Sequence, residues 1–204
     1  MVNFPALLNA FIKLLIIVNP ITMTAIFISY TRGMTEKDRK ATARKTCLSV
    51  LVILILCAWL GTSIFNFFGI NLYSLEIVGG LSLLLSCLKS LGGGTSIQDQ
   101  VKNDISIVPL SIPIIAGPAA ISVVIKSTAA GDNLFMTRAF SETVVCIIIT
   151  LILGAFLGRS TSITKFLGET TINVISCVSY LILACIAVDL MASGMSGMNA
   201  MMFT

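Results

Sequence analysis

Two proline-containing stretches place helix-breaking and hydrogen-bonding residues inside segments that are otherwise apolar. The first, residues 17–22, contains Asn19, Pro20 and Thr22, and the second, residues 111–122, contains Gly117 and Pro118. Proline lacks an amide hydrogen and clashes with the carbonyl group one turn before it, and the residue that precedes proline disfavours helical geometry. Each stretch therefore predicts a helix divided into two half-helices.

Half-helix ends carry polar backbone groups that can bind a solute. The amides of Thr22, Met23, Ala120 and Ile121 are expected at half-helix N-termini, where the helix dipole favours a carboxylate or another anion. Carbonyl groups freed by proline suit an ammonium group or a cation, and Asn19 is a good N-cap. The alternative is that both prolines only kink membrane helices. The predicted substrate-binding residues are Asn19, Pro20, Thr22, Thr24, Ala116, Gly117, Pro118, Ala119 and Ser122.

The composition indicates an all-α polytopic membrane protein. Hydrophobic residues make up 56% of the 204 residues and charged residues only 11%, which exceeds the apolar content of a soluble domain. A membrane-spanning helix needs about 20 mostly apolar residues. Six such spans are predicted, at residues 6–30, 46–68, 72–91, 107–128, 143–158 and 171–192.

The charges of the connections predict the orientation in the membrane. Residues 31–45 carry Arg32, Lys37, Arg39, Lys40, Arg44 and Lys45. Of the other seven lysine and arginine residues, Lys89 and Lys102 belong to the connection from the end of span 3 to span 4, and Arg159 and Lys165 to the connection between spans 5 and 6. Since cytoplasmic loops collect Lys and Arg, these three loops are predicted to be cytoplasmic and both termini to face outward. Thr35-Glu36-Lys37-Asp38 resembles a capping box that starts a helix leading into span 2.

The positions of the prolines suggest a duplicated unit. Pro20 lies near the centre of span 1 and Pro118 near the centre of span 4. Because each half has three spans, the second copy would be inverted relative to the first, and paired interrupted helices in inverted halves point to a transporter's central site. The predicted organisation is a single transmembrane domain, with repeats at 1–91 and 107–204 joined by a cytoplasmic linker at 92–106.

Three ionisable residues lie within the predicted spans. Glu76 starts span 3, Asp189 ends span 6 and Lys13 lies about two turns into span 1, all toward the outer face. Charges within spans are costly and are often functional. Two interpretations stay open. In the first, all three are interfacial residues: the two carboxylates reach water at the outer face, and Lys13 reaches water or pairs with one of them. In the second, they form an outer gate or a proton-coupling group.

The composition also excludes several kinds of chemistry. The chain has no histidine, which excludes Ser-His and Cys-His nucleophile pairs, and its 6 cysteines lie in apolar stretches without a Cys-x-x-Cys pair. We predict no catalytic residues, metal site or cofactor, and therefore no enzyme. The basic loop lacks the interleaved aromatic residues of a nucleic-acid site, so no nucleic-acid partner is expected, and the lipid bilayer is the expected surrounding.

Four stretches follow one another in a specific order and spacing: Asn19-Pro20-Ile21, the basic connection from Arg32 to Arg44, Gly79-Gly80 and the stretch from Ile107 to Pro118. Through them the chain resembles the MarC family, also described as small neutral amino acid transporters, over nearly its whole length. The resemblance implies an inner-membrane protein of six spans in two inverted repeats. For some members it implies uptake of glycine or alanine coupled to an ion gradient, which makes Na+ and H+ the candidate coupling ions.

These observations predict a secondary transporter of a small polar or zwitterionic solute, such as a small neutral amino acid, that works by alternating access around a midplane site. The small residues around Pro118 favour a small ligand. One alternative is a non-transporting membrane scaffold or accessory protein, and another is a passive channel. The sequence fixes neither the solute, nor the direction of transport, nor the oligomeric state.

Overall fold

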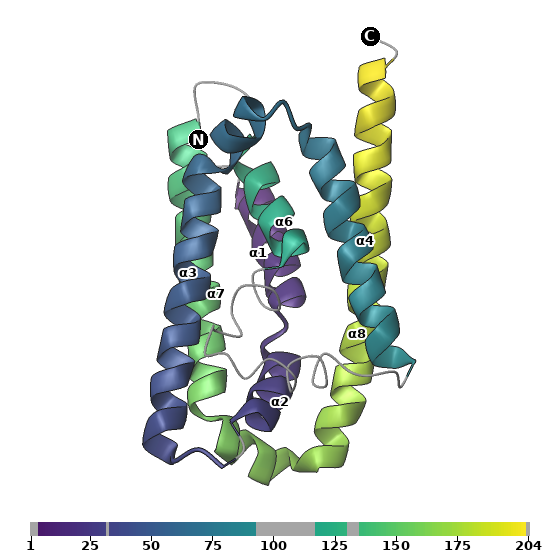
Figure 1. The fold of residues 1–204 in the computed structure, drawn as a ribbon. Helices are drawn as coiled ribbons and strands as arrows, with labels where there is room; N and C mark the ends of the chain where they lie inside the picture. Colours follow the sequence, from purple (N-terminus) through teal and green to yellow (C-terminus); the bar gives the residue numbers. More distant parts are fainter. Residues whose placement is uncertain (1–3, 32, 93–116, 130–134, 203–204) are drawn as a thin grey trace.

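The computed structural model describes residues 4–31, 33–92, 117–129 and 135–202. Within these ranges the chain forms helices and their short connections, and has no strand (Figure 1). The helices are α1 (Phe4–Val18), α2 (Pro20–Tyr30), α3 (Glu36–Phe67), α4 (Leu72–Leu91), α6 (Pro118–Ala129), α7 (Phe135–Gly158) and α8 (Ser160–Met202). Residues 93–106 of the predicted linker and residues 107–116 of the predicted span 4 lie outside the described ranges.

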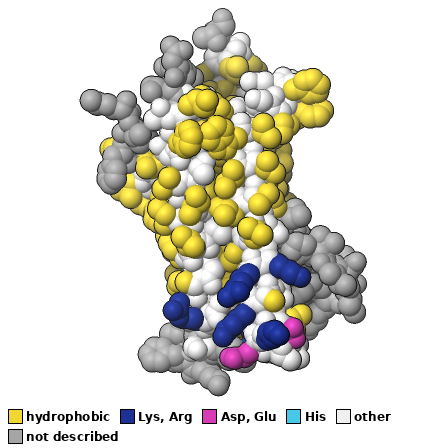
Figure 2. Space-filling model, turned by 90° about the vertical axis from the view of Figure 1, so that its left-hand side faces the viewer, with side chains coloured by type: hydrophobic (Ala, Val, Ile, Leu, Met, Phe, Trp, Pro, Cys, Tyr) yellow, Lys and Arg dark blue, Asp and Glu magenta, His cyan; other side chains and the backbone are white. Residues whose placement is uncertain are grey.

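Five of the described stretches are long and apolar enough to cross a membrane: Leu7–Thr24, Glu36–Phe67, Leu72–Leu91, Phe135–Gly158 and Val174–Met202. The apolar helix α6 is shorter. Large hydrophobic side chains such as Leu56, Leu85 and Leu151 point outward and are at least half exposed. Figure 2 shows hydrophobic side chains over most of this face, with lysine and arginine gathered at one end. Such a surface belongs in a bilayer.

The predicted helix boundaries hold best where a local signal marks them. Thr35 caps α3 as predicted, since its Oγ1 accepts a hydrogen bond from the Asp38 amide at 3.2 Å. The predicted fifth span began too late, since α7 starts at Phe135 and not at residue 143. The predicted start of span 6 at residue 171 agrees with the apolar stretch Val174–Met202, although helix α8 itself starts earlier, at Ser160. Polar residues precede the apolar part of both helices. Gly168, with φ 74° and ψ 156°, kinks α8 near its beginning.

The helices pack in reciprocal pairs. Helix α3 runs along α7, and α4 runs along α8 (Figure 1). Helix α6 contacts α3 and α4, while α2 contacts α7 and α8. The first half-helix, α1, contacts α6 and α7. The half-helices therefore lie between the two long pairs, α3–α7 and α4–α8.

Glycines permit the closest contacts between α4 and its neighbours. A Cβ atom on Gly80 would lie 2.6 Å from the Ala187 carbonyl oxygen of α8, and one on Gly194 would lie 2.7 Å from the Tyr73 carbonyl oxygen of α4. A Cβ atom on Gly79 would meet α6, 3.1 Å from the Pro118 carbonyl oxygen. The missing side chain of Gly79 thus lets α6 approach α4 closely, and that of the adjacent Gly80 lets α8 do the same, as small residues do in membrane helix packing.

Candidate functional site

The predicted interruption of the first span is present and lies at Asn19. This residue adopts a left-handed conformation, with φ 42° and ψ 74°, between the end of α1 at Val18 and the start of α2 at Pro20. Asn19 is 7% exposed. Asparagine tolerates the left-handed region better than most residues because its short polar side chain bonds locally. Its Oδ1 accepts a hydrogen bond from the Thr22 amide at 3.2 Å, which confirms Asn19 as the N-cap.

This cap uses both amides that the sequence predicted to be available at the start of α2. The Thr22 amide bonds the Asn19 side chain, and the Met23 amide bonds the Asn19 carbonyl oxygen at 3.0 Å. Neither amide is therefore free for a solute. The correction follows from the capping geometry, in which one asparagine satisfies two donors of the first turn.

The two hydroxyl groups after the break behave differently. Thr24 donates its hydroxyl to the Pro20 carbonyl oxygen at 2.7 Å, whereas the Thr22 hydroxyl is buried without a hydrogen-bond partner among the described residues. Both threonines are nearly inaccessible, with Thr22 at 2% and Thr24 at 1% exposed. Because a buried polar atom usually has a partner, the Thr22 hydroxyl is the unsatisfied polar group at this break.

The second predicted interruption is described only from Gly117 onward. Helix α6 starts at Pro118, and the Ile121 amide bonds the Gly117 carbonyl oxygen at 3.1 Å. Gly117 has no side chain that could cap the amides that follow it, so the first turn leaves the Ala119 and Ala120 amides without an acceptor inside the helix. Ala116 lies outside the described residues.

Contacts with α4 place the start of α6 near the middle of the molecule. Lys126 pairs with Glu76 near the start of α4, and a Cβ atom on Gly79 would meet Ser122 Oγ at 2.9 Å and Ala119 Cα at 3.2 Å. The two helices are thus antiparallel, and α6 begins beside a residue well inside α4. Ser122 donates its hydroxyl to the Ala119 carbonyl oxygen at 2.9 Å.

The structure therefore assembles part of the predicted site. The break residues Asn19, Pro20, Thr22 and Thr24 are all buried, as are Ala119 and Ser122, while Gly117 is partly buried and Pro118 is exposed. Helix α6 lies against α1, the half-helix that leads into Asn19. The half-helices α1 and α6, one from each predicted interrupted span, are thus neighbours in the bundle.

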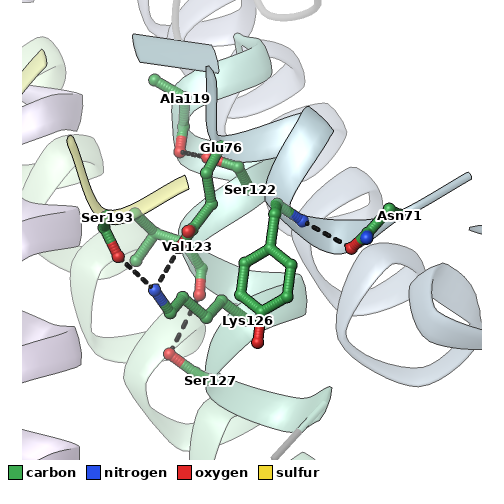
Figure 3. Close-up of polar contacts among 9 residues, drawn as sticks. Asn71, Glu76, Ala119, Ser122, Val123, Lys126, Ser127 and Ser193 are labelled. Atoms are coloured by element: carbon green, nitrogen blue, oxygen red, sulfur yellow. Dashed lines mark hydrogen bonds and ion pairs between the residues drawn. The ribbon is translucent and has the colours of Figure 1, made fainter. Parts of the chain in front are cut away.

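The three ionisable residues predicted together do not form one group. Lys13 and Asp189 are exposed, whereas Glu76 is buried, at 1% exposed, contrary to the expectation that it reaches water. Its ion-pair partner is Lys126 of α6, not Lys13. Lys126 also donates a hydrogen bond to Ser193 Oγ of α8 at 2.8 Å (Figure 3). One ammonium group thus joins α4, α6 and α8.

The Glu76 carboxylate is held by charge more than by directed hydrogen bonds. Lys126 Nζ lies close to Glu76 Oε1, yet neither carboxylate oxygen accepts a hydrogen bond of good geometry from the described residues. The lysine side chain is 49% exposed, so water screens part of this attraction. Sequence reasoning missed the pair because its partners lie in different predicted repeats.

Sequence reasoning also missed Glu142, a buried carboxylate of α7. Glu142 is 2% exposed, and its Oε1 has no hydrogen-bond partner among the described residues. The predicted fifth span began one residue later, so Glu142 was counted with the connection. The signal was its spacing: Ala139, Cys146 and Ile149 are buried at helical intervals from it.

Replacing Asn19 by alanine is expected to destabilise the protein by about 1–2 kcal/mol, since it removes the N-cap and places a Cβ-bearing residue without a local hydrogen bond in the left-handed region. Thermal unfolding in detergent measures the loss. Asn19→Gly is the matched control, because glycine accepts this conformation and costs only a few tenths of a kcal/mol as a cap. Equal unfolding temperatures for the alanine variant and the wild type would contradict the role of Asn19.

The bundle of apolar helices, with a buried break in its first span, defines a polytopic helical membrane protein. The MarC family model, described as an integral membrane protein family, matches residues 4–199. The chain belongs to this family.

Curated relatives match over almost their whole length. The Bacillus subtilis (strain 168) UPF0056 membrane protein YvbG is 36% identical over 96% of both chains. The Escherichia coli (strain K12) UPF0056 membrane protein YhcE is 29% identical over 96% of this chain and 94% of its own. A UPF0056 membrane protein of Buchnera aphidicola subsp. Schizaphis graminum is 30% identical over 95% and 93%, respectively. No solved structure matches the chain.

Proposed function

We propose that this protein is a secondary transporter of a small polar or zwitterionic solute, such as glycine or alanine, which binds between the half-helices at the midplane of the inner membrane. One observation carries the proposal: the first span is broken inside the protein at Asn19, beside a buried Thr22 hydroxyl that has no partner among the described residues. Irregular backbone at membrane depth is tolerated only where protein or a wet cavity surrounds it.

The polarity of the half-helix ends suggests how a zwitterion would lie. The start of α2 is capped by Asn19, whereas Gly117 leaves the first amides of α6 without a side-chain cap. A solute carboxylate is therefore assigned to the α6 end, near Ala119 and Ala120, where the dipole is positive. The ammonium group is assigned to the α1–α2 break, where Pro20 cannot donate to a backbone carbonyl.

Reciprocal helix contacts support an inverted repeat of six spans, with α6 as the second half of span 4. In this scheme α2, α3 and α4 correspond to α6, α7 and α8. The contacts of α6 with α3 and α4 then correspond to those of α2 with α7 and α8. Rocking one repeat against the other would expose the site alternately to each side.

The basic start of α3 supports an orientation with both termini outward. Lys37, Lys40, Arg44 and Lys45 are exposed there, at the end of the molecule where α8 also begins, opposite the C-terminal end of α8 (Figure 1). Lysine- and arginine-rich connections stay in the cytoplasm. In this orientation the Glu76–Lys126–Ser193 cluster lies toward the outer side and is assigned as the outer gate.

Solute binding tests the site directly. At 100 times its Kd a ligand stabilises the folded state by about 2.7 kcal/mol, so glycine or alanine should raise the unfolding temperature of the detergent-solubilised wild type. Gly117→Leu, which fills the start of α6, should remove this shift. A shift of the same size in the variant would contradict the site, and a wild type that no small amino acid, sugar or anion stabilises would favour the membrane-scaffold alternative.

A further inference from the structure

Glu142 is a buried acidic residue without an assigned partner. It lies on the buried stripe of α7 together with Ala139, Cys146 and Ile149, and 2% of its surface is accessible. Its Oε1 accepts no hydrogen bond from the described residues. The neighbouring Thr143 is already engaged, because its Oγ1 accepts from Trp59 Nε1 of α3 at 3.1 Å and donates to the Ala139 carbonyl oxygen at 2.7 Å.

The position of α7 connects this carboxylate to the moving parts of the proposed mechanism. Helix α7 packs along α3 and also contacts α1, α2 and α6, the three half-helices that the structure describes. A shift of either repeat would therefore change the surroundings of the buried face of α7. A group on this face that binds a cation in one state and releases it in another couples the cation to that shift.

The charged groups around Glu142 leave it without a fixed counter-ion in the described contacts. The only other buried carboxylate of the described residues, Glu76, already pairs with Lys126. Lys13 of α1 is exposed, and α2 contains no charged residue. The remaining ionisable groups of the described residues on α7 and on the elements packed against it are Arg138 and Cys146 of α7, Cys47, Cys57 and the acidic and basic residues of the first turns of α3, and Cys177, Tyr180, Cys185 and Asp189 of α8. Asp189 is exposed.

The neighbourhood favours a proton over a metal cation. Hard cations take several oxygen ligands, whereas the buried residues of α7 within two turns of Glu142 are Ala139, Val145, Cys146 and Ile149, whose side chains offer no oxygen. The next buried hydroxyl, that of Thr150, donates to the Cys146 carbonyl oxygen. A proton needs only the carboxylate oxygen itself. Carboxylates at such depth serve as proton relays in membrane transporters.

We propose that Glu142 is the proton-coupling residue of this transporter. In the outward-facing state Glu142 Oε1 takes one proton from water on the outer side and forms a neutral carboxyl group. In the inward-facing state it returns that proton to water on the cytoplasmic side. This inference rests on the proposed transport function and adds the identity of the coupling ion and of the residue that carries it.

The experiment compares wild type, Glu142→Gln and Glu36→Gln in proteoliposomes. Glu36 is an exposed glutamate of α3, so Glu36→Gln is the matched control. With acid outside, wild type and Glu36→Gln should accumulate labelled glycine or alanine and carry protons inward, as a trapped pH dye reports. Glu142→Gln should accumulate at least tenfold less labelled solute than wild type, yet still exchange labelled for unlabelled solute when both sides contain it.

Each outcome decides the inference. Gradient-driven accumulation by Glu142→Gln, or a wild type driven by Na+ alone, would overturn it. If wild type showed neither accumulation nor exchange, the proposed transport function itself would be contradicted, and the coupling role with it. Infrared spectra give a readout without transport. Acidification protonates every carboxylate of the protein, and the resulting band should contain one component that is lost in Glu142→Gln and kept in Glu36→Gln; the same component in all three proteins would contradict the assignment.

Discussion

Replacing Gly80 by leucine is expected to abolish the folded protein, and replacing it by alanine is expected to destabilise it by about 1–3 kcal/mol, the range for overpacked interiors. A Cβ atom at this position would lie 2.6 Å from the Ala187 carbonyl oxygen and 3.1 Å from the Met191 amide nitrogen. Both atoms belong to the backbone of α8, so the helices themselves must separate. Thermal unfolding and size-exclusion profiles in detergent measure the effect.

Gly154 of α7 is the control for this prediction. A Cβ atom there would make an ordinary contact, 3.5 Å from Cys47 Sγ, and Gly154→Ala should leave the unfolding temperature within the range of surface substitutions, about 0.5 kcal/mol. If Gly80→Ala were as harmless as Gly154→Ala, the close packing of α4 on α8 would be wrong.

Removing the charge of Lys126 is expected to have the second largest effect. Lys126→Met leaves the buried Glu76 carboxylate without its cation, and an uncompensated buried polar group costs about 1–3 kcal/mol, more when it is charged. The expected loss of unfolding free energy stays within this range, because the lysine side chain is half exposed and water screens part of the attraction. Thermal unfolding of the detergent-solubilised protein measures it.

A double-mutant cycle separates the pair from its surroundings. Glu76→Gln combined with Lys126→Met removes both charges, and the double variant should recover most of the stability that Lys126→Met loses. Lys13→Met, at an exposed lysine of α1, is the control. Equal losses for Lys126→Met and Lys13→Met, or additive losses in the double variant, would show that the ion pair does not hold α4 and α6 together.

Local signals in the sequence were sufficient for the break and for the helix starts that have side-chain caps. Pro20 and Asn19 together specify where the first span divides, because one lacks an amide hydrogen and the other satisfies the donors of the next turn. Thr35 marks the start of α3 in the same way. The apolar runs also identified the five long membrane-spanning stretches of the described residues, although a polar first turn precedes the apolar part of α7 and α8.

Long-range contacts account for what could not be predicted. The role of Gly79 depends on α6, and the role of Gly80 depends on α8, both distant in the sequence. Glu76 was expected near water because it starts an apolar run, but helix packing buries it beside Lys126. Glu142 was missed because a charge at the edge of a span resembles a loop residue until the face of the helix is known.

The start of α8 and the basic start of α3 lie together at one end of the bundle (Figure 1). Uptake of labelled glycine or alanine into proteoliposomes under an imposed proton or sodium gradient tests the central claim most directly. The proposed site predicts accumulation above equilibration that stops when the gradient is dissipated and is absent in Gly117→Leu. No uptake by the wild type, flux that ignores the gradient, or uptake that is unchanged in Gly117→Leu would contradict it.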